Sequence, residues 1–179
     1  MDEMVILVDP QDRAIGIEEK IKAHRDGKLH RAFSVFVFNE KGEILLQQRA
    51  FNKYHSGGLW TNACCSHPRP GEAIEQAAAR RLQEEMGFAC QLRRAFQFIY
   101  KAELDGGLIE HELDHVFIGT YNGAVKPDTN EVADFRWRHV HTIKNDLKHS
   151  LEKYTVWFKL AFGRALNFIT TNDSLPTSF

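Results

Sequence analysis

The 179-residue sequence has only three cysteines, no long apolar run and no excess of either charge. Cys64, Cys65 and Cys90 are an odd number and too few for a disulfide framework, so we expect reduced thiols in a cytoplasmic protein. No apolar stretch reaches about 18 residues, and the first residues lack the features of a signal peptide, so we expect no membrane partner. The 23 basic and 24 acidic side chains create no global field that would attract nucleic acid, so any bound anion needs a local basic cluster.

The remaining composition is that of an ordinary folded domain. It is 43% hydrophobic and 26% charged, which excludes collagen-like and disordered chains. A chain of this length buries roughly 70% of its unfolded surface, enough for a core without disulfides. No repeat and no linker is visible, so we expect a single domain over residues 1–179, with its core at about 30–169 and a frayed tail at 170–179. The oligomeric state stays open between a monomer and a weak dimer.

Residue patterning predicts mixed strands, one central helix and C-terminal helices, typical of an α/β or α+β sandwich. The central helix is expected at about Glu72–Met86, ended by Gly87, and one or two helices at Thr142–Phe168. Asp105-Gly106-Gly107 predicts a hairpin turn, whereas Ile17–His24 is ambiguous. The expected strands are Val5–Val8, Ala32–Phe38, Glu43–Gln48, Leu59–Cys65, Gln91–Lys101, Ile109–Gly119 and Val132–Val140.

The central helix carries a charged face that a solvated, ion-paired surface would also explain. The segment from Ser66 to Phe88 nevertheless resembles the Nudix box in register, through Glu72, Arg80, Leu82, Glu84, Glu85, Gly87 and Phe88. This resemblance implies a Nudix-like α/β/α sandwich with a mixed sheet. Ser66 replaces the first glycine of the box, and Arg81 replaces a glutamate of the carboxylate cluster on which Nudix hydrolysis depends.

Histidines and a pair of glutamates form a second unusual set. Glu110 and Glu112 point to one face of a strand, because side chains alternate with period two. Two such close carboxylates repel unless a cation or a shared proton compensates. Imidazole and carboxylate donors together suit a divalent transition ion such as zinc or manganese, and His24, His30 and His67 supply the imidazoles. The alternative is that each histidine is structural or exposed.

Three segments together resemble a more specific family. AHRDGKLHRAFS (23–34), LWTNACCSHPRPGE (59–72) and IEHELDHVF (109–117) are similar to the diagnostic motifs of the type I isopentenyl diphosphate isomerases, and the likeness covers nearly the whole chain. That family has a modified Nudix fold and interconverts isopentenyl and dimethylallyl diphosphate. An arginine at the position of Arg81 is usual there, so the departure from the hydrolase pattern agrees with the isomerase family.

The resemblance implies a role for each matching residue. It makes Cys65 and Glu112 the catalytic pair and places Tyr100 and Trp157 beside the isoprenoid carbons. It makes Lys20, Arg49, Lys53 and Arg81 contacts of the diphosphate, with Glu85 holding Mg²⁺ there. One tightly bound divalent ion (Mn²⁺, Zn²⁺ or Mg²⁺) is implied at His24, His30, His67, Glu110 and Glu112.

Moving an unactivated double bond requires a proton donor, a proton acceptor and a dry pocket, since the intermediate resembles a tertiary carbocation. Glu112, coupled to Tyr100, is the candidate donor. Cys65 as a thiolate is the candidate acceptor, and it needs a cationic neighbour to ionise. If its segment is extended, Cys65 shares a face with His67, whereas Cys64 points away. Two alternatives stay open: a Nudix pyrophosphohydrolase, and a noncatalytic module that binds metal or nucleotide.

Overall fold

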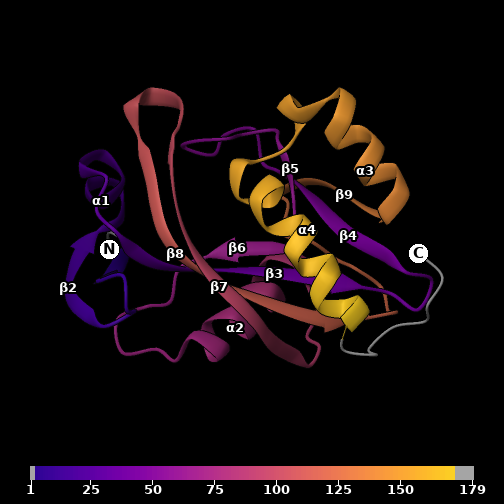
Figure 1. Ribbon diagram of the computed structural model, residues 1–179, viewed down its shortest axis with the longest axis horizontal. Coiled ribbons are helices and arrows are strands. Elements are labelled where there is room, and N and C mark those ends of the chain that lie inside the picture. Colours follow the sequence, from indigo (N-terminus) through magenta and orange to yellow (C-terminus); the bar gives the residue numbers. More distant parts are fainter. Residues whose placement is uncertain (1–2, 172–179) are drawn as a thin grey trace.

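The computed structural model describes residues 3–171 and shows a mixed sheet between helical layers (Figure 1). Within these residues nine strands form one sheet. The strands are β1 Met4–Val8, β2 Ala14–Glu19, β3 His30–Phe38, β4 Glu43–Arg49, β5 Trp60–Thr61, β6 Cys64–Ser66, β7 Leu92–Glu103, β8 Ile109–Thr120 and β9 Val132–His139.

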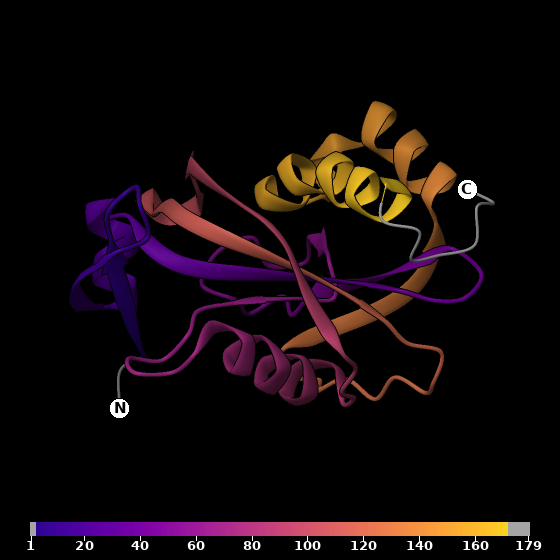
Figure 2. The ribbon, with the colours of Figure 1, turned by 60° about the horizontal axis from the view of Figure 1, so that its bottom comes forward.

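Helices cover both faces of this sheet, as Figure 2 shows. Helix α2 (Ile74–Met86) packs on one face, and helices α3 (Val140–His149) and α4 (Val156–Thr171) pack on the other. The short helix α1 (Lys20–Asp26) lies at the end of the sheet near β1 and β2. Single turns of 3₁₀ helix, η1 (Asp105–Gly107) and η2 (Leu151–Lys153), join β7 to β8 and α3 to α4. The expected α/β/α sandwich is therefore confirmed.

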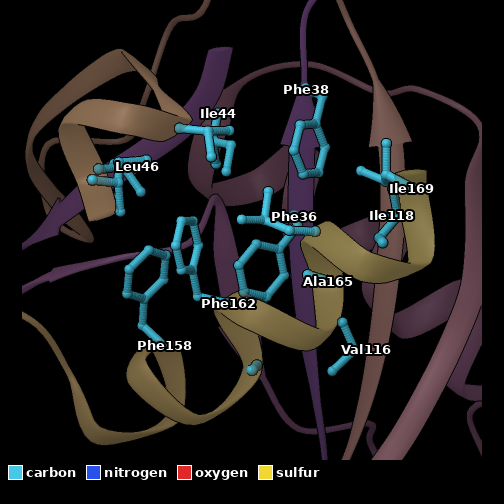
Figure 3. Packing of buried hydrophobic residues seen from close by; sticks show 14 of the residues in the cluster. Phe36, Phe38, Ile44, Leu46, Val116, Ile118, Phe158, Phe162, Ala165 and Ile169 are labelled. Atoms are coloured by element: carbon cyan, nitrogen blue, oxygen red, sulfur yellow. The ribbon is translucent and has the colours of Figure 1, made fainter. Parts of the chain in front are cut away.

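Two apolar cores follow from the alternation of side chains along β3. Phe36 and Phe38 pack with α4 residues such as Phe158 and Phe162 (Figure 3). Residues of the opposite parity, Phe33, Val35 and Val37, pack against α2 on the other face. A strand buried on both faces reads as a continuous apolar run, which is why AFSVFVF contains so few polar residues.

The central strand β3 is parallel to β8 over its whole length, from His30 opposite Glu112 to Phe38 opposite Thr120. Its pairing with β4 is limited to Phe38 and Ile44. Beyond that pair β3 continues with β6, and β4 continues with β5. The sheet is therefore open between β3 and β4, and the candidate site lies at this opening.

Most expected elements are confirmed, and the differences have local causes. The central helix begins at Ile74 rather than Glu72, because the Glu72 carboxylate accepts the amide of Arg69 and pairs with Arg80. The expected strand Leu59–Cys65 is two short strands, β5 and β6. It is interrupted at Asn62, whose side-chain amide donates to the carbonyls of Val35 and Cys64.

The ambiguous segment Ile17–His24 contains the end of β2 and most of α1. Glu19 makes the switch from strand to helix, because its carboxylate accepts the amides of Ile21 and Lys22, both at 2.7 Å. Gly27 ends α1 in the left-handed conformation, with φ of 62°. At the other end of the chain, α4 continues to Thr171, so residues 170–171 are helical and not frayed. The rest of the expected tail, 172–179, lies outside the described residues. Within residues 3–171 no helix has the length and apolarity needed to cross a bilayer.

Candidate active site

A cavity of about 820 Å³ opens where β3 and β4 separate. Residues of the sheet, of α2, of α4 and of the loop between β4 and β5 line this cavity. Side chains of both charges line it together with a thiol and an indole. The residues expected to act there that line the cavity are Lys20, Arg49, Lys53, Cys65, His67, Arg81, Glu85, Glu110, Glu112 and Trp157.

Strand register brings the histidines to the glutamates. His30 is directly opposite Glu112 in the parallel β3–β8 pair, and its Nε2 lies 3.5 Å from Glu112 Oε1. His67 follows β6, and its Nε2 lies 2.9 Å from the same Glu112 oxygen. His24 reaches the cluster from α1. One ligand atom from each of His24, His30, His67 and Glu112 lies within 4.8 Å of the other three.

The imidazoles are oriented as metal ligands would be. The Nδ1 atoms of His24 and His30 lie 2.7 and 2.8 Å from the backbone carbonyls of Lys20 and Lys28. A carbonyl at Nδ1 holds the ring proton there and leaves the Nε2 lone pair free. Both Nε2 atoms are buried and have no hydrogen-bond partner among residues 3–171. Buried, unpartnered nitrogens beside a carboxylate fit a divalent cation, so the donor set suits the expected metal.

Glu110 takes a different place from the other expected ligands. One carboxylate oxygen of Glu110 lies within 4.8 Å of a ring nitrogen of His24 and of a ring nitrogen of His55, a histidine on the loop after β4. Burial and the charge of Glu112 raise the pKa of Glu110 well above its ordinary value. Burial also acts to raise the pKa of Glu112, but His30 and His67 together hold that pKa well below its ordinary value. The two carboxyl groups therefore differ in their preference for a proton.

Tyr100 reaches Glu112 from the neighbouring strand. It is paired with Glu112 across β7 and β8, and its hydroxyl donates to Glu112 Oε2 at 2.7 Å. The side chain is buried, and Tyr100 does not line the cavity. Tyr100 therefore contacts the Glu112 carboxylate directly, and its expected position beside the isoprenoid carbons stays a prediction.

Cys65 lies on the opposite side of β3 from Glu112, because β6 and β8 are the two neighbours of β3 at this level. Its thiol donates to Asn62 Oδ1 at 3.1 Å, and the indole Nε1–H of Trp157 donates to its sulfur at 2.9 Å. The hydroxyl of Ser34 lies 3.7 Å from the sulfur and also donates to the buried Asp114 carboxylate at 2.8 Å. Burial, and then the charge of Asp114, raise the pKa of Cys65.

The neighbouring Cys64 points the other way, as strand alternation predicts. It is fully buried in the apolar core against α2, together with Ala77 and Leu82. Trp157 was expected to present its ring face to the substrate. The structure adds a second contact, the hydrogen bond from its indole to Cys65, which composition and spacing could not predict.

The four basic residues expected at the diphosphate all line the cavity. Lys20 pairs with Glu3 at 2.6 Å, and Lys53 pairs with Glu131. Arg81 donates to Glu84 at 2.9 Å and to the buried Glu85 at 2.7 Å. The guanidinium of Arg49 lies 5.3 Å from the centre of the Trp157 ring.

Sequence reasoning did not single out His55, and it gave no role to Asn62, Ser34 or Asp114, which lie inside the quoted motif segments. His55 lies in a loop with no periodic pattern, and its only signal was its position two residues after Lys53. Ser34 and Asp114 meet only because β3 and β8 are parallel neighbours.

Comparison with known proteins identifies the family of this chain. The family model of the NUDIX domain matches residues 28–158. The chain is 54% identical over 165 residues to an isopentenyl-diphosphate Delta-isomerase of Burkholderia multivorans, covering 92% of this chain and 94% of that protein. The chain belongs to the isopentenyl-diphosphate Delta-isomerase family of Nudix proteins. An isopentenyl-diphosphate Delta-isomerase of Serratia proteamaculans is 51% identical over 158 residues, or 88% of each chain.

Solved structures resemble the fold at lower sequence identity. A crystal structure of a protein from Deinococcus radiodurans superposes with a TM-score of 0.76 at 16% identity, covering 90% of this chain and 98% of that one. The crystal structure of a MutT protein from Methanosarcina mazei gives a TM-score of 0.64 at 22% identity, covering 80% and 95% of the two chains. These likenesses support the Nudix fold and not a particular reaction.

Proposed function

We propose that this protein interconverts isopentenyl diphosphate and dimethylallyl diphosphate in the supply of isoprenoid precursors. The observation that carries the proposal is that Cys65 and Glu112 line one cavity from the two sides of β3, together with a cluster of basic residues. Relatives that are about half identical over most of this chain bear the name of that activity. The three free cysteines are consistent with a protein of the reducing cytoplasm.

The reaction transposes one double bond and changes no other atom. A proton is added to carbon 4 and another is removed from carbon 2, through an intermediate with positive charge at carbon 3. One member of the Cys65 and Glu112 pair gives a proton while the other takes one. Without a proton path at both carbons the double bond does not move, so both residues are needed.

The walls of the cavity protect the cationic intermediate. Trp157 is buried and presents aromatic surface, and a cation over an aromatic ring gains about 0.5–2 kcal/mol. Tyr100 fixes the position of Glu112 through its hydrogen bond to Oε2. A nucleophilic water would trap the intermediate, so the apolar wall at Trp157 also serves to exclude water.

The diphosphate binds at the basic end of the cavity through Lys20, Arg49, Lys53 and Arg81. Guanidinium and ammonium groups suit phosphate oxygens, and the chain has a formal net charge of −1, so a bound anion depends on a local cluster such as this one. Glu85, held by Gln47 at 3.0 Å, is a ligand for the Mg²⁺ that accompanies the diphosphate.

A second divalent ion is held by His24, His30, His67, Glu110 and Glu112. When bound, this ion supplies positive charge that compensates the two carboxylates and favours their ionised forms. The imidazole donors favour zinc or manganese over magnesium. The residues of this chain that orient the ligands are Lys20 and Lys28, through their carbonyls, and Tyr100.

The pairing of Arg81 opposes pyrophosphate hydrolysis. Its guanidinium occupies the place of a box carboxylate and neutralises Glu84 and Glu85 instead of adding to their charge. Incubation of the metal-loaded protein with isopentenyl diphosphate and Mg²⁺, followed by NMR, tests the proposal. We expect dimethylallyl diphosphate without released phosphate. Phosphate release without isomer would support a hydrolase, and no change in the substrate would support a noncatalytic module.

A further inference from the structure

His55 lies among the candidate metal ligands although no motif includes it. Its side chain is 2% exposed, and its Nε2 lies 3.7 Å from Glu110 Oε1. That nitrogen is buried and has no hydrogen-bond partner within the described residues. Leaving a buried polar atom unpaired costs about 1–3 kcal/mol, so a binding partner for this nitrogen is needed.

The ring of His55 is prepared in the same way as those of His24 and His30. Its Nδ1 lies 3.2 Å from the hydroxyl of Ser56, whose oxygen can accept a hydrogen bond from the ring Nδ1–H and so leave the Nε2 lone pair free. Ser56 adopts a φ of 50°, a conformation that few serines accept, and its side chain meets the ring of His55 there. All three histidines therefore have an oxygen at Nδ1 and an open, buried Nε2.

The two groups of candidate ligands share His24, and this decides how many ions they hold. One group is His24, His30, His67 and Glu112, and the other is His24, His55 and Glu110. The Nδ1 of His24 is occupied by the Lys20 carbonyl, so the ring has one nitrogen left for a metal. One nitrogen binds one ion, so His24 cannot serve two ions at once, and a single ion either takes ligands from both groups or leaves one group without an ion.

We propose that His55 is a sixth protein ligand of the ion held by His24, His30, His67, Glu110 and Glu112; this inference rests on the metal site of the proposed function. Four imidazoles and two carboxylates give six donors. A site filled by protein donors leaves no position for water or for the diphosphate, as in structural metal sites. The ion then organises the wall of the cavity that contains Glu112, and the diphosphate is left to the separate Mg²⁺ at Glu85.

A crystal structure of the zinc-loaded protein tests the proposal without any substitution. We expect His55 Nε2 at about 2.0–2.1 Å from the ion, the usual zinc–imidazole distance. If the ion is bound by the other residues and His55 Nε2 lies beyond about 3 Å, His55 is not a ligand and the proposal is wrong, whereas the metal site of the proposed function stands.

Zinc affinity, measured by competition with a chelator, provides a second test. We expect His55→Gln and His30→Gln each to weaken zinc binding by at least about tenfold, since even residues that only orient metal ligands contribute 10–100-fold. His141→Gln on the exposed part of α3 is the control and should bind as the wild type does. Thermal unfolding of each variant checks that it folds.

The pattern of affinities separates the two levels of the argument. Loss in His30→Gln with unchanged affinity in His55→Gln overturns the role of His55 alone. Unchanged affinity in both variants overturns the metal site itself and the role of His55 with it. Equal losses in both, together with the short His55–zinc distance, support the proposal.

Discussion

Replacing Trp157 by phenylalanine removes one hydrogen bond from Cys65 and keeps an aromatic ring in place. The indole Nε1–H lies 2.9 Å from the sulfur, and the side chain is buried, so no water takes its place without rearrangement. A hydrogen bond to a charged group contributes about 1.5–3 kcal/mol. If the sulfur carries negative charge during the proton transfer, we expect kcat to fall by about 10- to 150-fold, since each 1.36 kcal/mol is a factor of ten.

The remaining aromatic contact is tested by a second substitution at the same position. Trp157→Ala also removes the ring beside the cationic intermediate, and we expect a further loss of about 2- to 30-fold from the 0.5–2 kcal/mol of the cation–π contact. The assay is the initial rate of dimethylallyl diphosphate formation at saturating substrate. KM should change little in Trp157→Phe, because the diphosphate contacts are on other residues.

Trp137→Phe is the matched control, since Trp137 is a half-buried tryptophan of β9 that packs in the core against α2. It should keep the wild-type kcat. Wild-type kcat in Trp157→Phe together with an inactive Trp157→Ala would show that only the ring matters, and the role assigned to the indole N–H would be wrong.

Three further predictions concern other parts of the site. Cys65→Ala should lower turnover by orders of magnitude and leave the bound metal in place, whereas Cys64→Ala, a substitution in the core against α2, should keep its activity; the reverse pattern of rates would invert the assignment. Arg81→Glu should raise KM for isopentenyl diphosphate and release no phosphate, because one added carboxylate does not rebuild a water-activating site; phosphate release from a nucleoside diphosphate derivative would contradict this. Burial, and then the charge of Glu112, raise the pKa of Asp114 to about 8, so between pH 4 and 8 the folded protein holds a proton that the unfolded chain has lost. The stability that this group contributes is complete below about pH 4 and is lost as the pH rises to 8. The unfolding free energy of the metal-free wild type should therefore fall relative to that of Asp114→Asn by about 1.4 kcal/mol per pH unit between pH 5 and 7.5. Unfolding free energies with the same pH dependence in the two proteins would refute this prediction.

Features set by local sequence could be predicted well. The spacing of apolar residues and Gly87 located α2 to within two residues, and the aromatic and β-branched run located β3. Strand alternation separated Cys64 from Cys65. These inferences depend on one segment at a time. The family resemblance, which covers nearly the whole chain, pointed to the other residues that line the cavity.

Features that depend on the pairing of distant segments could not be predicted. The contact of Tyr100 with Glu112 follows from the register of β7 and β8, which cannot be read from the sequence alone. The contact between Trp157 and Cys65 requires α4 to pack over the opening between β3 and β4. His55 belongs to a loop without periodicity, and only the folded loop shows that its nitrogen faces Glu110.

Deuterium incorporation during turnover tests the central claim most directly. With metal-loaded protein, Mg²⁺ and isopentenyl diphosphate in D₂O, dimethylallyl diphosphate should form with solvent deuterium in the methyl group derived from carbon 4, because the proton comes from an exchangeable group of the protein. Mass spectrometry and NMR of the product give the amount and the position of the label. Product that forms without solvent deuterium, or phosphate release in place of isomer, would contradict a mechanism of protonation and deprotonation by Cys65 and Glu112.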